Sequence, residues 1–296
     1  MHPNTVQIDA ATMTKLQSWQ ERSETMSDVI TAAPLRALSA TLDRDDPVPE
    51  DGSAVPALWH WLYFLPHARQ SEIGPDGHPR RGGFLPPVPL PRRMWAGGRL
   101  RWEADNPLRV GQEVQRISTI RSVQHKTGRS GELLFVLVEH RFLNHDGLVL
   151  VEEHDIVYRA AARPGDPVPP PQQPPLAGQA AWSRTIVPDD ILLFRYSALT
   201  FNGHRIHYDR QYVTQVEGYP GLIVHGPLIA TLLLDLLRRQ LPGARVVAFD
   251  FKALRPTFDL HPFSVHGKPR EDGRTIDLWA QDHEGLLTMQ ATATVA

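Results

Sequence analysis

The stretch VHGPLIATLLLDLLRRQLPG, residues 224–243, decides the fold class of this chain. Its leucines recur at helical spacing, Pro227 suits the first turn of a helix, and a Pro-Gly pair ends the run. Its apolar part, GPLIATLLLDLL (226–237), is shorter than a membrane-spanning helix and is followed by Arg238 and Arg239. It therefore predicts one buried helix.

Strand-like runs follow this helix. They are rich in β-branched and aromatic residues and are separated by turns, which is typical of antiparallel strands. The runs are VVAFDFKALRP (246–256), FSVHGKPRED (263–272), GRTIDLWAQDHEG (273–285) and LLTMQATATV (286–295). The helix and these runs predict an α+β module.

The earlier part of the chain has the same order of elements. Its strand-like runs are RVGQEVQRISTIRSVQHK (109–126), ELLFVLVEHRFLNHDG (132–147) and LVLVEEHDIVYRAA (148–161). A weaker helical pattern, MSDVITAAPLRALSATLD (26–43), precedes them and is interrupted by Pro34. We therefore expect two α+β modules side by side.

A proline-rich run, ARPGDPVPPPQQPPLAGQ (162–179), separates the two modules and predicts an extended linker. We expect a first half over residues 1–161, a linker over 162–184 and a second half over 185–296.

The composition and charge of the chain exclude some classes of partner and of chemistry. The 296 residues are 41% hydrophobic and 22% charged, and the formal net charge of −2 provides no field for holding a polyanion, so we expect no nucleic-acid partner. The chain has no cysteine, which excludes disulfides and thiolate chemistry. With no secretory signal and no spanning segment expected, the cytoplasm is the predicted compartment and no membrane partner is expected.

Polar chemistry concentrates in FRYSALTFNGHRIHYDR, residues 194–210. His204 and His207 stand three residues apart, and His67 and His225 add imidazoles elsewhere. Because no compact ligand motif with a third carboxylate accompanies them, we expect no metal. An acid/base role or an ordinary polar loop remain as readings of this stretch.

The second half resembles the MaoC-like hydratases and dehydratases of the hotdog fold. Their pattern Asp-x-Asn-Pro-aliphatic-His falls on residues 202–207, and their aliphatic-His-Gly segment falls on IVHGPL (223–228). LPGARVVAFDFKALRPTF (241–258) is similar to the strand that follows their helix, so the resemblance covers residues 185–296.

The first half resembles the degenerate N-terminal hotdog of two-domain members. LPRRMWAGGRL (90–100) is similar to a stretch in the branch of type 2 hydroxyacyl-thioester dehydratases and mesaconyl- or itaconyl-CoA hydratases. The resemblance implies a double hotdog of class α+β, in which each module has a long helix wrapped by a curled antiparallel sheet.

The activity implied is that of a lyase that reversibly hydrates a 2-enoyl-CoA and needs no cofactor. The acyl group expected is short and branched or dicarboxylic, as in itaconyl-CoA or mesaconyl-C4-CoA. A 3-hydroxyacyl-ACP dehydratase and a non-catalytic acyl-CoA-binding protein are the alternatives. A hotdog thioesterase is less favoured, because the carboxylate on which that reaction depends is missing from the motif.

The resemblance assigns proton transfer to His207, whose imidazole titrates near neutrality. It also assigns binding of the thioester oxygen to the backbone N–H of Gly226. This residue lies at the first turn of the helix, where free N–H groups favour negative charge. Pro227 after Gly226 is equally consistent with a glycine that only precedes the helix.

Asn202 departs from the pattern, which has an aspartate there, and a carboxamide cannot accept a proton at neutral pH. Three alternatives follow. In the first, His207 works alone and Asn202 aligns the water or the thioester. In the second, His204, Asp209 or Glu217 takes the role of the missing aspartate, and in the third, catalysis is lost.

Arg205 stands where the pattern has proline, and a guanidinium can bind the free carboxylate of a dicarboxylic acyl chain, although a surface arginine is an equal reading. We expect Arg92 and Arg93 to bind the same carboxylate or the phosphates of CoA, and His204 and His225 to contact substrate. Further pairing between chains is left open.

Overall fold

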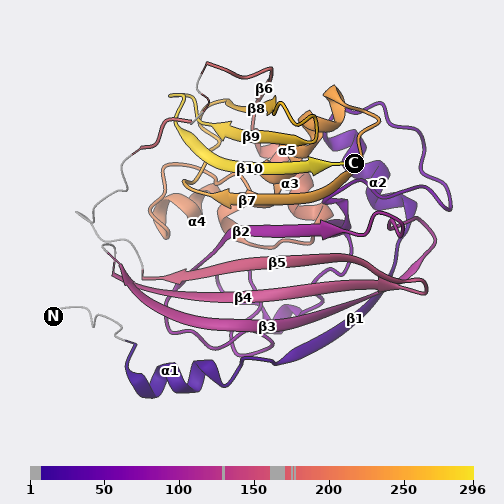
Figure 1. The fold of residues 1–296 in the computed structure, drawn as a ribbon. Coiled ribbons are helices and arrows are strands. Elements are labelled where there is room, and N and C mark those ends of the chain that lie inside the picture. The colour runs from indigo at the N-terminus through magenta and orange to yellow at the C-terminus, as the bar shows by residue number, and fades with distance from the viewer. Residues whose placement is uncertain (1–7, 129–130, 161–170, 175, 177) are drawn as a thin grey trace.

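The computed structural model describes residues 8–128, 131–160, 171–174, 176 and 178–296. Over these residues ten strands form one antiparallel sheet (Figure 1). The first half contributes β1 (Ser23–Val29), β2 (Arg92–Trp102), β3 (Glu113–Gly128), β4 (Gly131–Asn144) and β5 (Gly147–Arg159). The second half contributes β6 (Trp182–Ile186), β7 (Val246–Ala253), β8 (Phe263–Pro269), β9 (Thr275–Gln281) and β10 (Leu287–Val295).

The two halves meet where β2 pairs with β7, in the strand order β1-β3-β4-β5-β2-β7-β10-β9-β8-β6. Gly97 lies opposite Lys252 and Gly98 opposite Phe251. A Cβ atom on Gly97 would lie 2.5 Å from the Phe251 carbonyl oxygen, so a larger residue there would push the strands apart. The glycines of the LPRRMWAGGRL stretch thus permit the contact that joins the halves.

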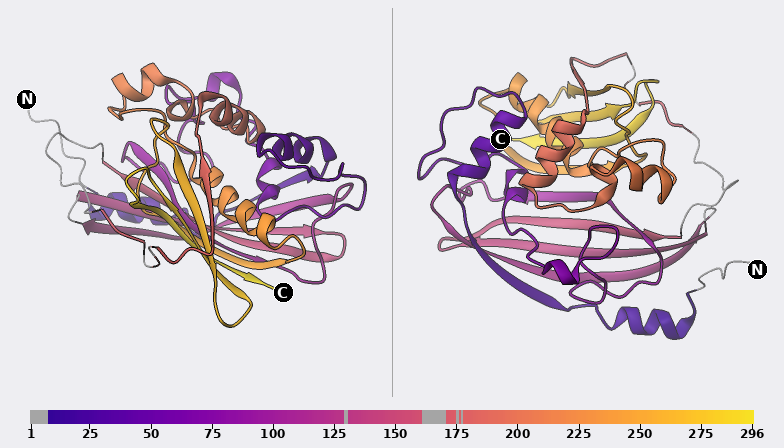
Figure 2. Two further views of the ribbon diagram at one scale, coloured as in Figure 1. Left: turned by 90° about the horizontal axis from the view of Figure 1, so that it is seen from above. Right: turned by 180° about the vertical axis from the view of Figure 1, so that it is seen from behind.

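Helices lie mainly on one face of this sheet. They are α1 (Ala10–Gln17), α2 (Ala32–Thr41), α3 (Asp190–Leu199), α4 (Arg210–Gln215), α5 (Gly226–Gln240) and the short 3₁₀ turns η1 (Trp59–Leu62), η2 (Gln70–Glu72) and η3 (Arg205–His207). Figure 2 shows α2, α3, α4 and α5 on the same side of the strands. In the described part of the chain, no helix has the length and apolar character needed to cross a membrane.

The buried helix predicted from residues 224–243 is confirmed as α5, in which every residue from Leu228 to Leu237 is buried. It packs against β6, β8, β9 and β10. One hydrophobic cluster runs through both halves, because it includes Leu100 and Phe142 of the first half with Leu233 and Phe249 of the second. The predicted strand runs on either side of the linker are confirmed as β3, β4, β5, β7, β8, β9 and β10.

The prediction of one interrupted helix over residues 26–43 is wrong in two respects. Met26–Val29 belong to β1, which pairs with β3. Pro34 does not interrupt α2, because it lies in the first turn, where a backbone N–H has no partner inside the helix.

The predicted linker over residues 162–184 lies partly outside the described residues, which omit 161–170, 175 and 177. Its last residues form a strand, because β6 begins at Trp182 and pairs with β8. The division into two modules and a linker stays a prediction.

A buried ionic cluster ties the first half to α5. The Asp235 side chain is 1% exposed and accepts from Arg44 Nη1 at 2.6 Å, Arg184 Nη1 at 2.6 Å and Arg239 Nε at 2.8 Å. Arg44 comes from the segment after α2, and Arg184 comes from β6. Because each carboxylate oxygen is paired, the buried charge is compensated only while these segments are in place.

Candidate active site

The motif residues 202–207 lie between α3 and α4. The backbone turns at Phe201, whose φ of 48° is left-handed, and the Asn202 amide then donates to the Ser197 carbonyl at 2.8 Å. The Asn202 Oδ1 accepts from the His204 amide at 3.0 Å. One function of Asn202 is therefore to close this turn, whatever else its side chain contacts.

His207 is buried, with 8% of its surface exposed. Its Nδ1 lies 2.7 Å from the Ile223 carbonyl oxygen. Because a carbonyl only accepts, Nδ1 carries the hydrogen and Nε2 carries the lone pair. Burial lowers the pKa of His207 to about 4, so its imidazole is neutral at pH 7 and Nε2 is ready to accept a proton.

His225 supports this ring. It lies just before α5, is fully buried, and stacks on His207 with centroids 3.7 Å apart. Its Nε2 is 2.8 Å from Ser197 Oγ. Burial holds the pKa of His225 well below its usual value, so both stacked rings are neutral. Substrate contact by His225 stays a prediction, and its burial favours a positioning role.

Gly226 is the first residue of α5 and Pro227 follows it. A Cβ atom built on Gly226 would have no other heavy atom within 4 Å, so there is open space beside it. The first turn of a 15-residue helix concentrates unpaired N–H groups and the positive end of the helix dipole. Negative charge is therefore stabilised at this place.

A loop from the first half packs directly on the motif. The Arg205 amide donates to the Asp76 carbonyl at 2.9 Å. Gly77 has a left-handed φ of 89°, and a Cβ atom there would lie 1.8 Å from the Gly203 carbonyl oxygen. Only glycine fits this contact, which brings Asp76 and His78 to the motif.

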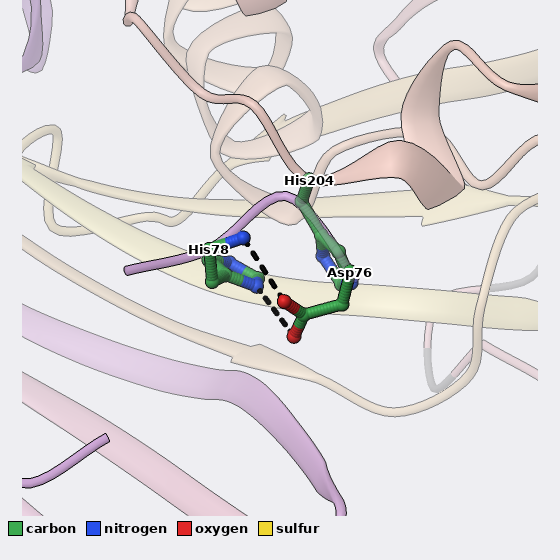
Figure 3. Close-up of side chains that lie close together, drawn as sticks. All are labelled: Asp76, His78 and His204. Carbon is green, nitrogen blue, oxygen red and sulfur yellow. Dashed lines mark hydrogen bonds and ion pairs between the residues drawn. The ribbon is translucent and has the colours of Figure 1, made fainter. Parts of the chain in front are cut away.

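Figure 3 shows the resulting cluster of Asp76, His78 and His204. Asp76 Oδ1 accepts from the His78 amide at 3.1 Å, and Oδ2 lies 3.4 Å from His78 Nδ1. The His78 and His204 rings are 4.0 Å apart. Burial raises the pKa of Asp76, but its hydrogen bonds from His78 outweigh this effect and hold the pKa well below its usual range.

The same three side chains could hold a metal ion, because their ligand atoms all lie within 4.8 Å of one another. The absence of a metal stays a prediction, and the structure adds that one carboxylate, Asp76, lies beside His204, one of the two motif histidines. The sequence could not supply it, because Asp76 lies in the other half of the chain. Burial and the neighbouring His78 lower the pKa of His204 to about 2, so this ring is neutral as well.

A cavity of about 870 Å³ adjoins the motif. From the second half it is lined by residues of α3, of the motif and of the start of α5, including Tyr196, Ser197, Asn202, Gly203, Tyr208 and Pro227. From the first half it is lined by charged and aromatic residues, including His78, Arg93, Arg116, His140, Glu152 and His154.

The far end of the cavity is polar and buried. Glu152 accepts from His60 Nε2 at 2.9 Å and from Trp61 Nε1 at 3.0 Å. Burial raises the pKa of Glu152, but these contacts with His60 and the nearby histidines outweigh it and bring the pKa to about 2. Burial lowers the pKa of His140 to about 3 and that of His154 to about 4. Glu152 is thus charged, and both histidines are neutral.

Arg116 is the unusual member of this end of the cavity. Its Nε is buried and has no hydrogen-bond partner among the described residues. Its other nitrogens contact weak or distant acceptors, the Phe64 carbonyl at 3.4 Å and the Met26 sulfur at 2.9 Å. Burial lowers the pKa of Arg116, and the Glu24 and Glu152 carboxylates offset this effect only in part, so its positive charge lacks full compensation. An anion in the cavity would supply it.

The arginines selected from the sequence separate into two groups. Arg205 donates from Nε and Nη2 to Asp209 Oδ2 at 3.0 and 2.7 Å and from Nη1 to the Pro75 carbonyl. Arg92 donates to the Glu217 carbonyl at 2.8 Å. Only Arg93 of the three lines the cavity. Carboxylate binding by Arg205 and Arg92 stays a prediction, and their protein contacts favour a structural role.

The carboxylates proposed to replace the family aspartate are also engaged. Asp209 caps α4 by accepting from the Tyr212 amide at 2.9 Å, besides its pair with Arg205. Glu217 accepts from the Tyr212 hydroxyl at 3.1 Å. Neither is among the residues that line the cavity. The predicted His204, His207 and Gly226 are not among them either, although they adjoin it, whereas Asn202 and His78, the partner of Asp76, do line it.

Comparison with known proteins identifies the family. The model of the hydroxyacyl-thioester dehydratase type 2 family matches residues 58–259. The chain belongs to this family. A type 2 dehydratase is a carbon–oxygen lyase that acts on acyl thioesters, so the predicted family and enzyme class are confirmed.

Individual relatives of this chain agree with the assignment. It is 49% identical over 278 residues to the mesaconyl-C(4)-CoA hydratase of Chloroflexus aurantiacus, covering 93% of this chain and 96% of that protein. A MaoC-like dehydratase of known structure aligns with a TM-score of 0.69 at 15% identity, over 95% of this chain and 99% of that chain.

A Mycobacterium tuberculosis protein described as having a double hotdog fold aligns with a TM-score of 0.56 at 13% identity, over 94% and 96% of the two chains. The fold of the type 2 dehydratase chain is therefore a double hotdog with α+β content, as predicted.

Proposed function

We propose that this chain hydrates the double bond of a short 2-enoyl-CoA whose acyl group carries a second carboxylate, as mesaconyl-C4-CoA and itaconyl-CoA do. The observation that carries the proposal is one cavity whose lining includes Asn202 and Pro227 as well as Arg116, whose Nε has no partner among the described residues. The 49% identity to a mesaconyl-C(4)-CoA hydratase supports the same substrate class.

Hydration needs a base for the attacking water, an acid for the α-carbon and stabilisation of the enolate that forms on the thioester oxygen. Neutral His207, with the lone pair on Nε2, is suited to take the proton from water. The first turn of α5 at Gly226 is suited to hold the thioester oxygen as it gains charge. Asn202, on the cavity wall, orients the water.

The distal carboxylate of the substrate would lie near Arg116 and Arg93. Both arginines line the cavity, and Arg116 has a buried donor without a partner in the described residues. Charge-assisted hydrogen bonds between guanidinium and carboxylate are short and strong. Glu24 and Glu152 also line the cavity and attract Arg116, so a substrate carboxylate would share the positive charge of Arg116 with them.

We infer that each half is one hotdog module with its helix against a curled sheet, over residues 1–161 and 185–296 with a linker over 162–184. The first half furnishes the acyl pocket and the second half furnishes the motif. We propose that the enzyme works in the cytoplasm, and a homo-oligomer is compatible with the two-module chain.

The test is a screen of purified protein against mono- and dicarboxylic 2-enoyl-CoAs, with loss of the conjugated enoyl absorbance and product mass as readouts. We expect the highest kcat/KM for a short dicarboxylic substrate. Activity only on acyl carrier protein thioesters would favour the 3-hydroxyacyl-ACP dehydratase alternative. Binding without turnover would favour a non-catalytic acyl-CoA-binding protein.

A further inference from the structure

The motif as it stands offers one base, His207, for a reaction with two proton transfers. His207 is a neutral base, and a neutral imidazole whose only N–H already donates to the Ile223 carbonyl cannot also protonate carbon. Asn202 cannot donate an acidic proton near neutral pH. Either the His207 imidazolium, formed when it takes the proton from water, passes that proton to the α-carbon, or a second group acts as the donor.

Residues 75–78 of the first half form a loop that packs against the motif, and this loop offers a second group. His78 lines the same cavity as Asn202 and Gly203, and its side chain is 23% exposed. Its Nδ1 faces Asp76 Oδ2 at 3.4 Å, which leaves Nε2 as the atom available to substrate (Figure 3). Catalytic hydrogen bonds are often this long before substrate binds.

The position of the pair is fixed by backbone contacts. Asp76 receives the Arg205 amide on its carbonyl oxygen, and Gly77 lies against Gly203 so closely that no side chain fits. The His78 ring lies 4.0 Å from the His204 ring, whose centroid is in turn 5.4 Å from that of His207. The pair thus belongs to the same wall as the motif, although its residues come from the other half.

We propose that His78, held by Asp76, is the second proton-transfer residue of the reaction and replaces the aspartate that the motif lacks. This inference rests on the hydratase function proposed above. In hydration, water breaks an O–H bond, its oxygen bonds to the β-carbon and its proton goes to His207 Nε2. The His78 imidazolium gives its Nε2 proton to the α-carbon, where the electron pair of the enolate forms the C–H bond.

The proton on His207 then returns to His78 through solvent, so that one water has been added across the double bond. In dehydration the roles reverse, with neutral His78 taking the α-proton and the His207 imidazolium protonating the departing hydroxide.

The direction of the two roles follows from the neighbours of each ring. His78 has a carboxylate against its Nδ1, whereas His207 has only a backbone carbonyl there. A carboxylate stabilises an imidazolium much better than a neutral carbonyl does. Groups whose surroundings separate their pKa values in this way divide the acid and base roles between them.

The charges around His78 give a pH signature. Burial lowers the pKa of His78, the positive Arg93 and Arg81 lower it further, and Asp76 raises it without reversing the decrease, so the pKa lies below its usual value in the free enzyme, while His204 is neutral. Anionic substrate would favour the imidazolium in the complex. Because the acid form of His78 is needed for hydration, kcat/KM falls as pH rises through its pKa. Removing the Asp76 charge lowers this pKa, so the decrease of kcat/KM at high pH, the basic limb of the profile, begins at a lower pH.

The experiment compares His78→Gln and Asp76→Asn with a matched exposed pair, His145→Gln and Asp146→Asn. His145 and Asp146 are also a histidine and an aspartate in contact, at 3.1 Å, but their side chains are 78% and 58% exposed. For each variant, kcat and KM over pH, the melting temperature and the Kd of a saturated, unreactive acyl-CoA are measured.

We expect kcat of His78→Gln to fall by about 100- to 10 000-fold, the usual range for general acid–base catalysis. The melting temperature and the Kd should stay near those of the wild type, and the control variants should be fully active. In Asp76→Asn the basic limb should move to lower pH.

Full activity of His78→Gln in an active enzyme would overturn this inference alone, as would an unmoved limb in Asp76→Asn. Equal losses of kcat, melting temperature and affinity would assign the pair a structural role instead. Activity abolished by a chelator and restored by Zn²⁺ would also overturn it, because the cluster would then act as a metal site. A wild-type protein without hydratase activity would overturn both proposals.

Discussion

Replacing Arg116 with methionine tests the substrate class most directly. Arg116 Nε is buried without a partner in the described residues, and its pKa is lowered by burial, so the free enzyme holds a poorly compensated charge. A substrate carboxylate would balance the positive charge of Arg116. Removing one partner of a buried charged pair costs about 2 to 5 kcal/mol of binding. At about 1.4 kcal/mol per factor of ten, this corresponds to about 30- to 4000-fold in kcat/KM.

The loss should be confined to substrates with the second carboxylate. A crotonyl-type substrate has no group to pair with Arg116, so its kcat/KM should change little. The melting temperature should stay the same or rise, because a poorly compensated buried cation is replaced by an apolar side chain of similar length.

The assay measures kcat/KM for a dicarboxylic and a monocarboxylic enoyl-CoA in parallel, together with thermal unfolding. Arg141→Met is the control, because Arg141 is an exposed arginine on the neighbouring strand β4. An equal decrease on both substrates, or a clear loss of melting temperature, would refute the assignment of Arg116 to the carboxylate.

Three further variants test other parts of the structure. His207→Asn should lower kcat by about 100- to 10 000-fold with an unchanged circular dichroism spectrum, and wild-type turnover would remove its assigned role. Arg205→Gln should change kcat/KM for di- and monocarboxylic substrates by the same factor, since its guanidinium pairs with Asp209; a selective loss would restore its predicted substrate role. Asp235→Asn should lower the free energy of unfolding by about 3 to 5 kcal/mol in urea titrations, because Arg44 and its neighbours lose their buried counter-charge; an unchanged midpoint would contradict this.

Much of the fold was predictable because strand and helix periods are local properties. The alternation in residues 132–147 and the leucine spacing in 224–243 predict β4 and α5 correctly. Met26–Val29 were assigned to a helix because a short polar edge strand has no apolar alternation to reveal it. Its strand state depends on pairing with β3, which is a long-range contact.

The site was predictable only where it lies within one motif. His207 and Gly226 fall in adjacent motif segments, so family resemblance finds them. Asp76, His78 and Arg116 come from the first half, and no local spacing links them to the motif. The pairing of Arg205 with Asp209 was open to prediction, because residues four apart with opposite charge attract each other on a helical turn.

The pairing of β2 with β7 also governs how the molecule comes apart. If either half unfolded alone, the other would be left with an unpaired inner strand edge and half of a shared hydrophobic cluster. Such a state is costly, so we expect the two halves to lose structure in one cooperative transition. Loss of the Asp235 ion pairs on α5 would then also disrupt the first-half lining of the cavity. A variant library that mutates the first half to change substrate specificity should therefore start from a chain whose second half has first been stabilised.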